Sequence, residues 1–229
     1  MGAGSALADA ADFVSAFPVA GGKVVGVVNV VGAREKPKPL PVFKSRSFCG
    51  PSVPNETLLV SADGRLRNAV VILRPLRAVA AARPKSVVLD NQHCAFTPHV
   101  QVAPVGSELL LKNSDPILHT VHARLGQETL FNVGLPHWRQ VIKRLDRAGV
   151  IRIDCDVLHT WMSAVVIVTD SPYYLVSNER GEFFFDGIPA GAYEIEIWHE
   201  RLGRQVHQIA VRDNGMTDVD AIFARKKKP

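Results

Sequence analysis

Short strand patterns crowd the middle of the chain, and this feature restricts the possible fold more than any other. Eight segments rich in β-branched and aliphatic residues follow one another closely, with turn residues between them. They cover residues 87–89, 100–102, 108–112, 117–123, 129–133, 138–145, 149–155 and 164–169. No useful length of helical periodicity interrupts them, and such a series is typical of a β-sandwich or barrel. We predict an all-β domain over residues 86–170.

A second, smaller group of strand patterns follows a boundary at Ser171 and Pro172. Its clearest member, residues 193–197, alternates between apolar residues and glutamates, as expected of a strand with one buried and one solvent-facing side. We therefore predict a smaller β-sandwich over residues 171–224. The last residues, 225–229, form a basic tail.

The N-terminal part divides into a tail, residues 1–21, and a β segment, residues 22–85. Prolines interrupt regular structure in the middle of this segment. Residues 57–73 have the pattern of a hairpin that turns at Asp63 and Gly64. Whether the segment packs with the first or the second predicted sandwich stays open from the sequence alone.

A thiol, an imidazole and a thioether lie within eight residues of one another, at Cys155, His159 and Met162. Cys155 has the same strand parity as Ile151 and Ile153, so a strand ending here turns the thiol toward an apolar side. Soft sulfur ligands together with imidazole select copper, and two histidines, one cysteine and a weak axial methionine form a blue-copper site. This loop supplies three of those four ligands.

The missing histidine is expected in the strand pattern that follows Asn113. His119 shares its parity with Ile117 and Val121, whereas His122 lies on the opposite face. We therefore favour His119 as the inward-facing ligand. The side-chain amide of Asn113 is expected to bond the backbone near the Cys155 loop and to hold the two ligand segments in register.

The common alternative for each of these residues is simple packing. A cysteine at a strand end usually behaves as a small buried hydrophobe, and a methionine near a tryptophan usually fills a core. The grouping of Cys155, His159 and Met162 between two strand patterns is what favours a metal site over that alternative.

The other cysteines, Cys49 and Cys94, pair with each other if Cys155 binds a metal, and a disulfide there would indicate an oxidising compartment. The alternative, three free cytosolic thiols, stays open because sequence cannot fix connectivity. The N-terminus lacks the basic region and strong apolar core of a secretory signal.

The net charge is +5, which favours partners with an acidic docking surface. Nucleic acid is not indicated, because no cluster of Lys and Arg is interleaved with aromatic residues. No apolar run is long enough to cross a bilayer, so we expect no transmembrane segment.

Residues 89–106 and 111–121 resemble the first strands of a cupredoxin, and the spacing from Asn113 to His119 is similar to that of plastocyanin. The loop from Cys155 to Met162 resembles the second ligand segment of that fold. Over residues 22–224 the chain resembles bacterial plastocyanin-like proteins of the methylamine-utilisation-protein type. In those proteins a cupredoxin domain precedes a carboxypeptidase-regulatory-like, or transthyretin-like, β-sandwich.

This resemblance implies one type 1 copper ion held by His119, Cys155, His159 and Met162, and a disulfide between Cys49 and Cys94. It also implies a periplasmic or otherwise extracytoplasmic location, and electron transfer through the edge of His159 to a redox partner such as a c-type cytochrome. One departure is that three residues separate Cys155 from His159, where the plastocyanin-like relatives usually have two.

Three functions are therefore compared. The leading hypothesis is a one-electron carrier that is not an enzyme. The second is a metal-free extracytoplasmic binding or scaffold protein, since a fold alone does not define a function. The third is a zinc or copper enzyme, in which Cys155 would bind zinc with His119, His122 and His159; a thioether beside the thiolate suits a softer metal better.

Overall fold

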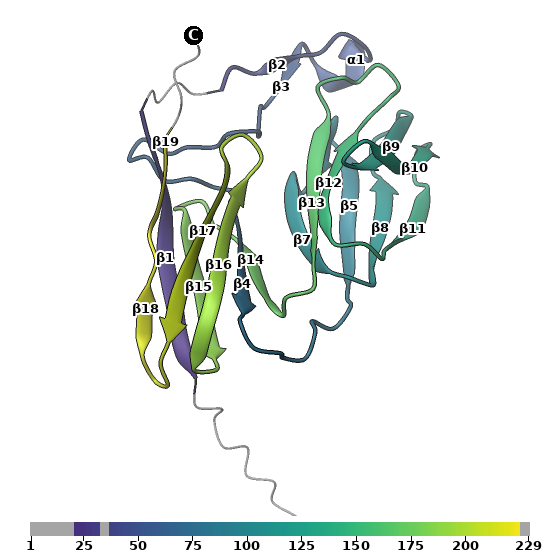
Figure 1. Cartoon of the computed structure of the whole chain (residues 1–229). Helices are drawn as coiled ribbons and strands as arrows, with labels where there is room; N and C mark the ends of the chain where they lie inside the picture. The colour runs from purple at the N-terminus through teal and green to yellow at the C-terminus, as the bar shows by residue number, and fades with distance from the viewer. Residues whose placement is uncertain (1–20, 33–36, 225–229) are drawn as a thin grey trace, which may run out of the picture.

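The computed structural model describes residues 21–32 and 37–224, and within them the chain folds almost entirely into β-strands (Figure 1). The predicted all-β class is confirmed. The only helix in the described residues is α1 (Arg46–Cys49), so none there is long enough to span a membrane. The predicted terminal tails lie outside the described residues, apart from residue 21.

The first sandwich is formed by two sheets from the middle of the chain. One sheet has the order β10 (Glu128–Leu135), β9 (His119–Leu125), β12 (Gly149–Asp154), β13 (Ser163–Thr169), β7 (Val100–Pro104). The other has the order β11 (Gln140–Leu145), β8 (Ser107–Asn113), β5 (Ser86–Gln92), β6 (Ala95–Thr97). The apolar residues of the two sheets meet in one core, so the alternating patterns gave the strand positions well and missed only the short β6.

The second sandwich contains strands from both ends of the chain. In one sheet β1 (Gly22–Val31) pairs with β15 (Glu182–Ile188), β18 (Met216–Asp218) and β19 (Ala221–Ala224). The other sheet has the order β14 (Tyr173–Val176), β4 (Val70–Pro75), β16 (Gly191–His199), β17 (Gly203–Val211). Both β1 and β4 therefore belong to the sheets that the C-terminal strands build.

The turn of the predicted hairpin over residues 57–73 is confirmed, but the prediction for its second arm is wrong. Val60 and Leu66 form an antiparallel bridge on either side of the turn at Gly64, and the N–H of Arg67 donates to the carbonyl of Leu59. The strand that follows, β4, pairs instead with β14 and β16. Its first four residues are all buried, which is the environment of a strand inside a sheet between two layers rather than of a hairpin arm with a solvent-facing side.

Residues 40–53, which we call the strap, leave the second sandwich and cross over the end of the first (Figure 1). The strap contains β2 (Leu40–Pro41), α1 and β3 (Ser52–Val53), and β2 pairs antiparallel with β3. Val42 and Val53 are buried in the core of the first sandwich. A disulfide joins Cys49 in α1 to Cys94, which confirms that expectation.

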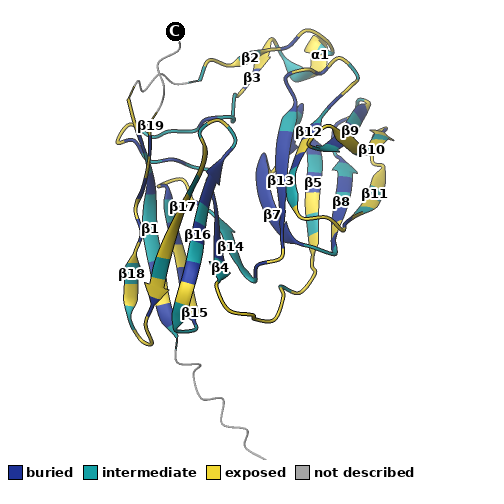
Figure 2. Cartoon of the chain, viewed as in Figure 1, coloured by how far each residue is buried: buried dark blue, intermediate teal, exposed yellow. Residues whose placement is uncertain are grey.

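The two sandwiches pack against each other through a smaller apolar cluster (Figure 2). It contains Val70 and Ile72 of β4, Val102 of β7, Ile167 of β13 and Trp198 of β16. Burial of these side chains on both faces of the contact holds the sandwiches together. A buried ion pair between His99 and Glu200 crosses the same boundary.

Candidate metal centre

One end of the first sandwich collects the predicted ligands from two strands and one loop. His119 is the first residue of β9, Cys155 directly follows β12, and Met162 directly precedes β13. Strands β9 and β12 are antiparallel neighbours in the same sheet, so the start of one lies beside the end of the other. This pairing brings together two segments that are far apart in sequence.

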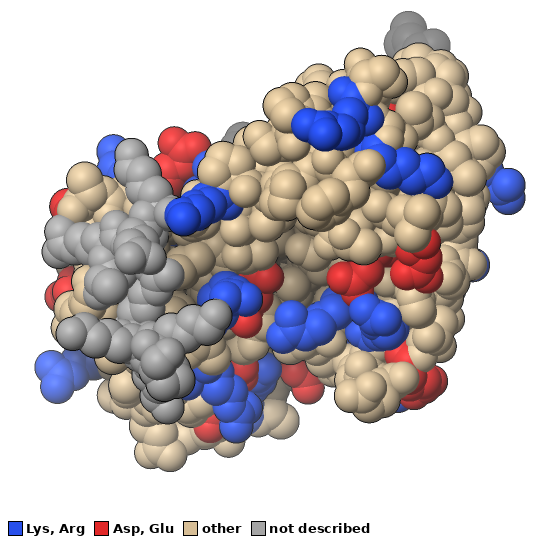
Figure 3. Space-filling model, turned by 90° about the horizontal axis from the view of Figure 1, so that it is seen from above, with Lys and Arg blue, Asp and Glu red and all other residues tan. Residues whose placement is uncertain are grey.

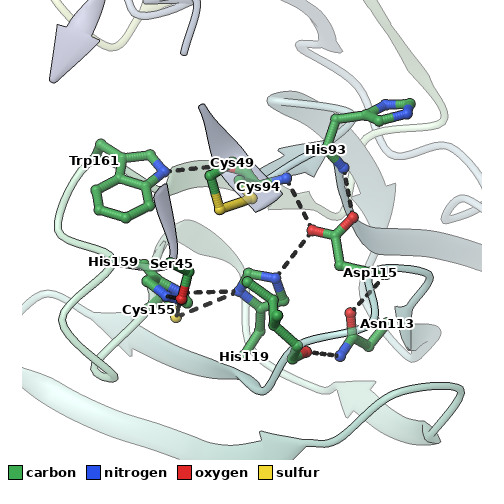
Figure 4. Close-up of a disulfide and its surroundings, with 11 residues drawn as sticks. Ser45, Cys49, His93, Cys94, Asn113, Asp115, His119, Cys155, His159 and Trp161 are labelled. Atoms are coloured by element: carbon green, nitrogen blue, oxygen red, sulfur yellow. Dashed lines mark hydrogen bonds and ion pairs between the residues drawn. A yellow bond between two sulfur atoms is a disulfide. The ribbon is translucent and has the colours of Figure 1, made fainter. Parts of the chain in front are cut away.

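Three of the four predicted ligands, His119, Cys155 and His159, form a close, buried cluster, which we call the group (Figure 4). The sulfur of Cys155 lies 4.0 Å from Nδ1 of His119 and 3.8 Å from Nδ1 of His159, and the two Nδ1 atoms are 3.1 Å apart. With metal bonds of about 2.0 Å to nitrogen and 2.3 Å to sulfur, a trigonal plane needs separations of about 3.7 Å between S and N and about 3.5 Å between the nitrogens. The donor set therefore fits a single ion to within a few tenths of an ångström.

Met162 is buried in the same core cluster as Cys155 and Trp161. Its backbone N–H donates to the carbonyl oxygen of His159, so the loop turns back on itself between these two residues. Met162 is therefore held in the apolar core by the loop that carries Cys155 and His159.

Asp115 fixes the ring of His119 through Nε2, the ring nitrogen that does not face Cys155. Its carboxylate lies 3.0 Å from Nε2 of His119 and accepts backbone N–H groups from His93 and Cys94. With Nε2 donating to the carboxylate, Nδ1 is left free to face Cys155. A carboxylate on the far nitrogen is the usual way to fix the tautomer and orientation of a metal-binding histidine.

The prediction that Asn113 bonds the backbone near the Cys155 loop is wrong, because its side chain bonds the turn that carries Asp115 instead. Its Nδ2 donates to the carbonyls of Ile117 and Leu135, and its Oδ1 accepts the N–H of Asp115. These three bonds fix the turn that carries Asp115 to the end of β10. The amide therefore positions His119 indirectly, through its carboxylate partner.

The electrostatics of the group favour a thiolate. Burial raises the pKa of Cys155, but hydrogen bonds from His119 and from the backbone of Thr120 and Val157 outweigh it, so the thiol pKa is lowered. The N–H of Thr120 lies 3.4 Å from the sulfur. Burial also lowers the pKa of His119, but the bond to Asp115 and the neighbouring thiolate raise it above its usual value. A thiolate is the form of cysteine that binds metals.

His159 differs from His119 because no carboxylate of the described residues bonds its ring. Burial, the charge of His119 and the charge of Lys44 lower its pKa to about 4, so its ring is neutral near pH 7. Its Nε2 lies 3.3 Å from the hydroxyl of Ser45 in the strap, and the residue is 1% exposed. The strap therefore covers the imidazole edge that the resemblance implied would meet a partner.

Trp161 packs beside the group, and a hydrogen bond fixes its indole ring. Its ring centroid is 5.0 Å from that of His159, and its Nε1–H donates to the carbonyl of Cys94. The indole thus links the ligand loop to the disulfide and excludes water from that side.

Backbone strain concentrates around this centre. In the described residues, the positive-φ residues that are neither Gly nor Asn are Ser45, His93, Cys94, Trp138 and Leu158. Each is adjacent to the group or bonded to one of its neighbours. Such conformations cost free energy and persist only where surrounding contacts enforce them, and they cluster at functional sites.

The remaining candidates lie outside the group. His122 points to the other side of β9, where its ring bonds Thr129 and lies 2.8 Å from the carboxylate of Asp156. His122 therefore cannot join Cys155, His119 and His159 as the fourth ligand of a zinc site. His199 is buried at the end of β16.

Sequence reasoning missed Asp115 and Ser45. Asp115 carried a usable signal, because it lies four residues before His119 in a turn rich in polar residues. Ser45 carried none, since it is 114 residues from His159 and belongs to a proline-rich segment with no strand pattern.

No protein-family model matches this sequence, and a search of curated proteins finds no match either. Solved structures are similar to parts of the chain. A purple cupredoxin from Nitrosopumilus maritimus is 20% identical, with 37% of this chain and 99% of that one covered and a TM-score of 0.32. A reduced amicyanin variant is 18% identical, with 43% and 99% covered and a TM-score of 0.33.

A copper-containing nitrite reductase from Thermus scotoductus is 21% identical over 42% of this chain, with a TM-score of 0.35. The match spans 25% of that enzyme's length. All three likenesses concern less than half of this chain.

Proposed function

We propose that this chain is an extracytoplasmic protein with one type 1 copper ion, and that it carries single electrons between redox partners such as c-type cytochromes. The observation that carries the proposal is the convergence of one thiol sulfur and two Nδ1 atoms in a buried group whose spacing suits one ion. Thiolate and imidazole ligands bind copper and zinc, and a thioether ligand from Met162 would favour the softer copper.

In this proposal His119, Cys155, His159 and Met162 would hold the copper. The copper, when bound, would take up and release one electron. The chain supplies the rigidity: Asp115 fixes the ring of His119, Thr120 donates to the sulfur of Cys155, and the strap covers His159. Ligands that cannot move keep their positions in both oxidation states.

The burial of the group favours electron transfer over catalysis. Met162 is 2% exposed and Cys155 is 4% exposed, so a substrate has no open route to the centre. The disulfide favours an oxidising compartment such as the periplasm. We further propose that residues 86–170 are a cupredoxin domain and that residues 171–224, with β1 and β4, build a carboxypeptidase-regulatory-like sandwich.

The test is an absorption and paramagnetic-resonance spectrum of the oxidised, copper-loaded protein, compared with Cys155→Ser and the matched control His122→Ala. We expect an intense thiolate-to-copper band that Cys155→Ser abolishes and His122→Ala keeps. Absence of the band in the wild type, or its survival in Cys155→Ser, would contradict the proposal. Stoichiometric copper analysis of the wild type separates a copper carrier from the metal-free scaffold.

A further inference from the structure

We propose that the outer face of the strap is the docking surface for an electron-transfer protein with an acidic surface. The inference rests on the proposed copper function and goes further, because it names the surface and the chemistry of the partner. The surface comprises Phe43, Lys44, Arg46 and Phe48, with Lys38 just before the strap.

The strap covers the edge of His159 that faces away from Cys155. The imidazole itself is 1% exposed, and the nitrogen that faces away from Cys155 meets the hydroxyl of Ser45 at 3.3 Å (Figure 4). A protein that docks on the strap is therefore separated from His159 by this single layer of chain.

Buried side chains and a disulfide fix the strap to the first sandwich. Val42 and Val53 anchor its two arms in the core of the first sandwich, and the disulfide from Cys49 anchors its helix. Ser45 has a φ of 58°, a conformation that costs free energy for a residue other than glycine. The surrounding contacts impose this conformation, which places the hydroxyl on His159.

The outer face of the strap exposes two large aromatic side chains. Phe43 is 74% exposed and Phe48 is 42% exposed, although each could bury a large apolar area. Two exposed aromatic side chains on one short segment are more than the scattered exposed residue that needs no explanation. Aromatic residues surrounded by charge are typical of the centre of a protein interface.

The charges of the strap and of Lys38 just before it are of one sign. Residues 37–53 contain three cations, Lys38, Lys44 and Arg46, and no acidic residue. All three are exposed. Figure 3 looks down on the end of the molecule that carries β2, β3 and α1, where Lys and Arg side chains are visible together with some Asp and Glu side chains. The strap itself complements a partner with acidic groups around an apolar centre.

A redox protein fits this surface better than an anionic membrane. Aromatic and basic side chains can also bind lipid headgroups. A membrane, however, would gain nothing from the strap's contact with His159, whereas an electron acceptor needs that proximity. One electron would leave Cu(I) and reduce an Fe(III) haem of the docked partner to Fe(II).

The first experiment is a nuclear magnetic resonance titration of the ¹⁵N-labelled protein with an acidic c-type cytochrome. We run it on both the metal-free and the Cu(I) protein, because docking does not require copper. We expect the amide shifts to concentrate at residues 42–50 and to vanish at high salt. Shifts centred on another face would overturn the proposal.

The second experiment measures oxidation of the Cu(I) protein by the same cytochrome in stopped flow. Reversing both charges with Lys44→Glu and Arg46→Glu should lower the second-order rate constant at least about tenfold at low ionic strength, since steering accounts for one or more decades of association rate. The visible spectrum checks that the copper centre is unchanged.

The matched control is Lys23→Glu with Arg212→Glu, which reverses two exposed cations on the other sandwich and changes the net charge by the same amount. We expect its rate constant to stay within about twofold of the wild type, because these cations do not lie on the strap. An equal loss in this control would show a net-charge effect and overturn the proposal. So would shifts at the strap with phosphatidylglycerol vesicles but none with the cytochrome. A missing copper band refutes the proposed function instead, and the metal-free titration still decides the docking surface.

Discussion

Replacement of Asp115 by asparagine tests the support of the metal centre without touching a ligand. The carboxylate is buried and accepts three hydrogen bonds, from the ring of His119 and from the N–H groups of His93 and Cys94. Asparagine has nearly the same shape, but its amide nitrogen donates. One of the three donors must then face another donor.

The magnitude follows from the bonds that are lost. A hydrogen bond to a charged group contributes about 1.5–3 kcal/mol, and leaving a buried donor unpaired adds a cost of similar size. Loss of the partner on the far side of a metal-binding histidine typically lowers metal affinity about 10–100-fold. We therefore expect Asp115→Asn to weaken copper binding by about 1.4–2.7 kcal/mol at 25 °C.

The assay is competition for Cu(I) with a chromophoric chelator, together with the unfolding midpoint of the metal-free protein. Asp156→Asn is the control, because this exposed carboxylate lies near the site and bonds Asn132 and His122. We expect the control to bind copper like the wild type. Copper affinity of Asp115→Asn within twofold of the wild type would refute the idea that this carboxylate orients His119.

Three further predictions concern stability. Replacing Cys49 and Cys94 by alanine opens a loop of 45 residues and should cost about 4 kcal/mol by chain entropy, measured by urea unfolding; a loss under about 1 kcal/mol would contradict this. Burial lowers the pKa of His99, but the hydrogen bond and charge of Glu200 outweigh burial and raise it above 6.5. The contribution of this pair to the free energy of unfolding is therefore fully present below pH 6.5 and is lost as the pH rises through the raised pKa. Glu200→Gln should flatten this decline in urea midpoint, and an unchanged pH profile would disprove the link. Gly26→Ala should destabilise by several kcal/mol in thermal unfolding, because its Cβ would come within 2.0 Å of a backbone oxygen of Val219; an unchanged midpoint would show that the sheet shifts freely.

Local pattern was sufficient for most of the fold. Strand positions in the first sandwich follow from the alternation of apolar and polar residues, because side chains of a strand point to opposite faces. The same parity argument predicted that His119 faces inward and His122 outward. In the structure His119 is buried and His122 is half-buried. The second arm of the predicted hairpin at residues 57–73 pairs with other strands. Periodicity identifies a strand and says nothing of its neighbours in the sheet.

The sequence by itself determined which residue types are present for a soft-metal site, and that the chain would build sheets. Only the tertiary structure decided what surrounds the group. The contact of Ser45 with His159 spans 114 residues, and that of Trp161 with Cys94 spans 67. Such contacts depend on where the strap crosses the sandwich, which is set by packing of Val42 and Val53 and by one disulfide. Long-range packing has no period along the chain, and so no local pattern could have revealed that the histidine edge is covered.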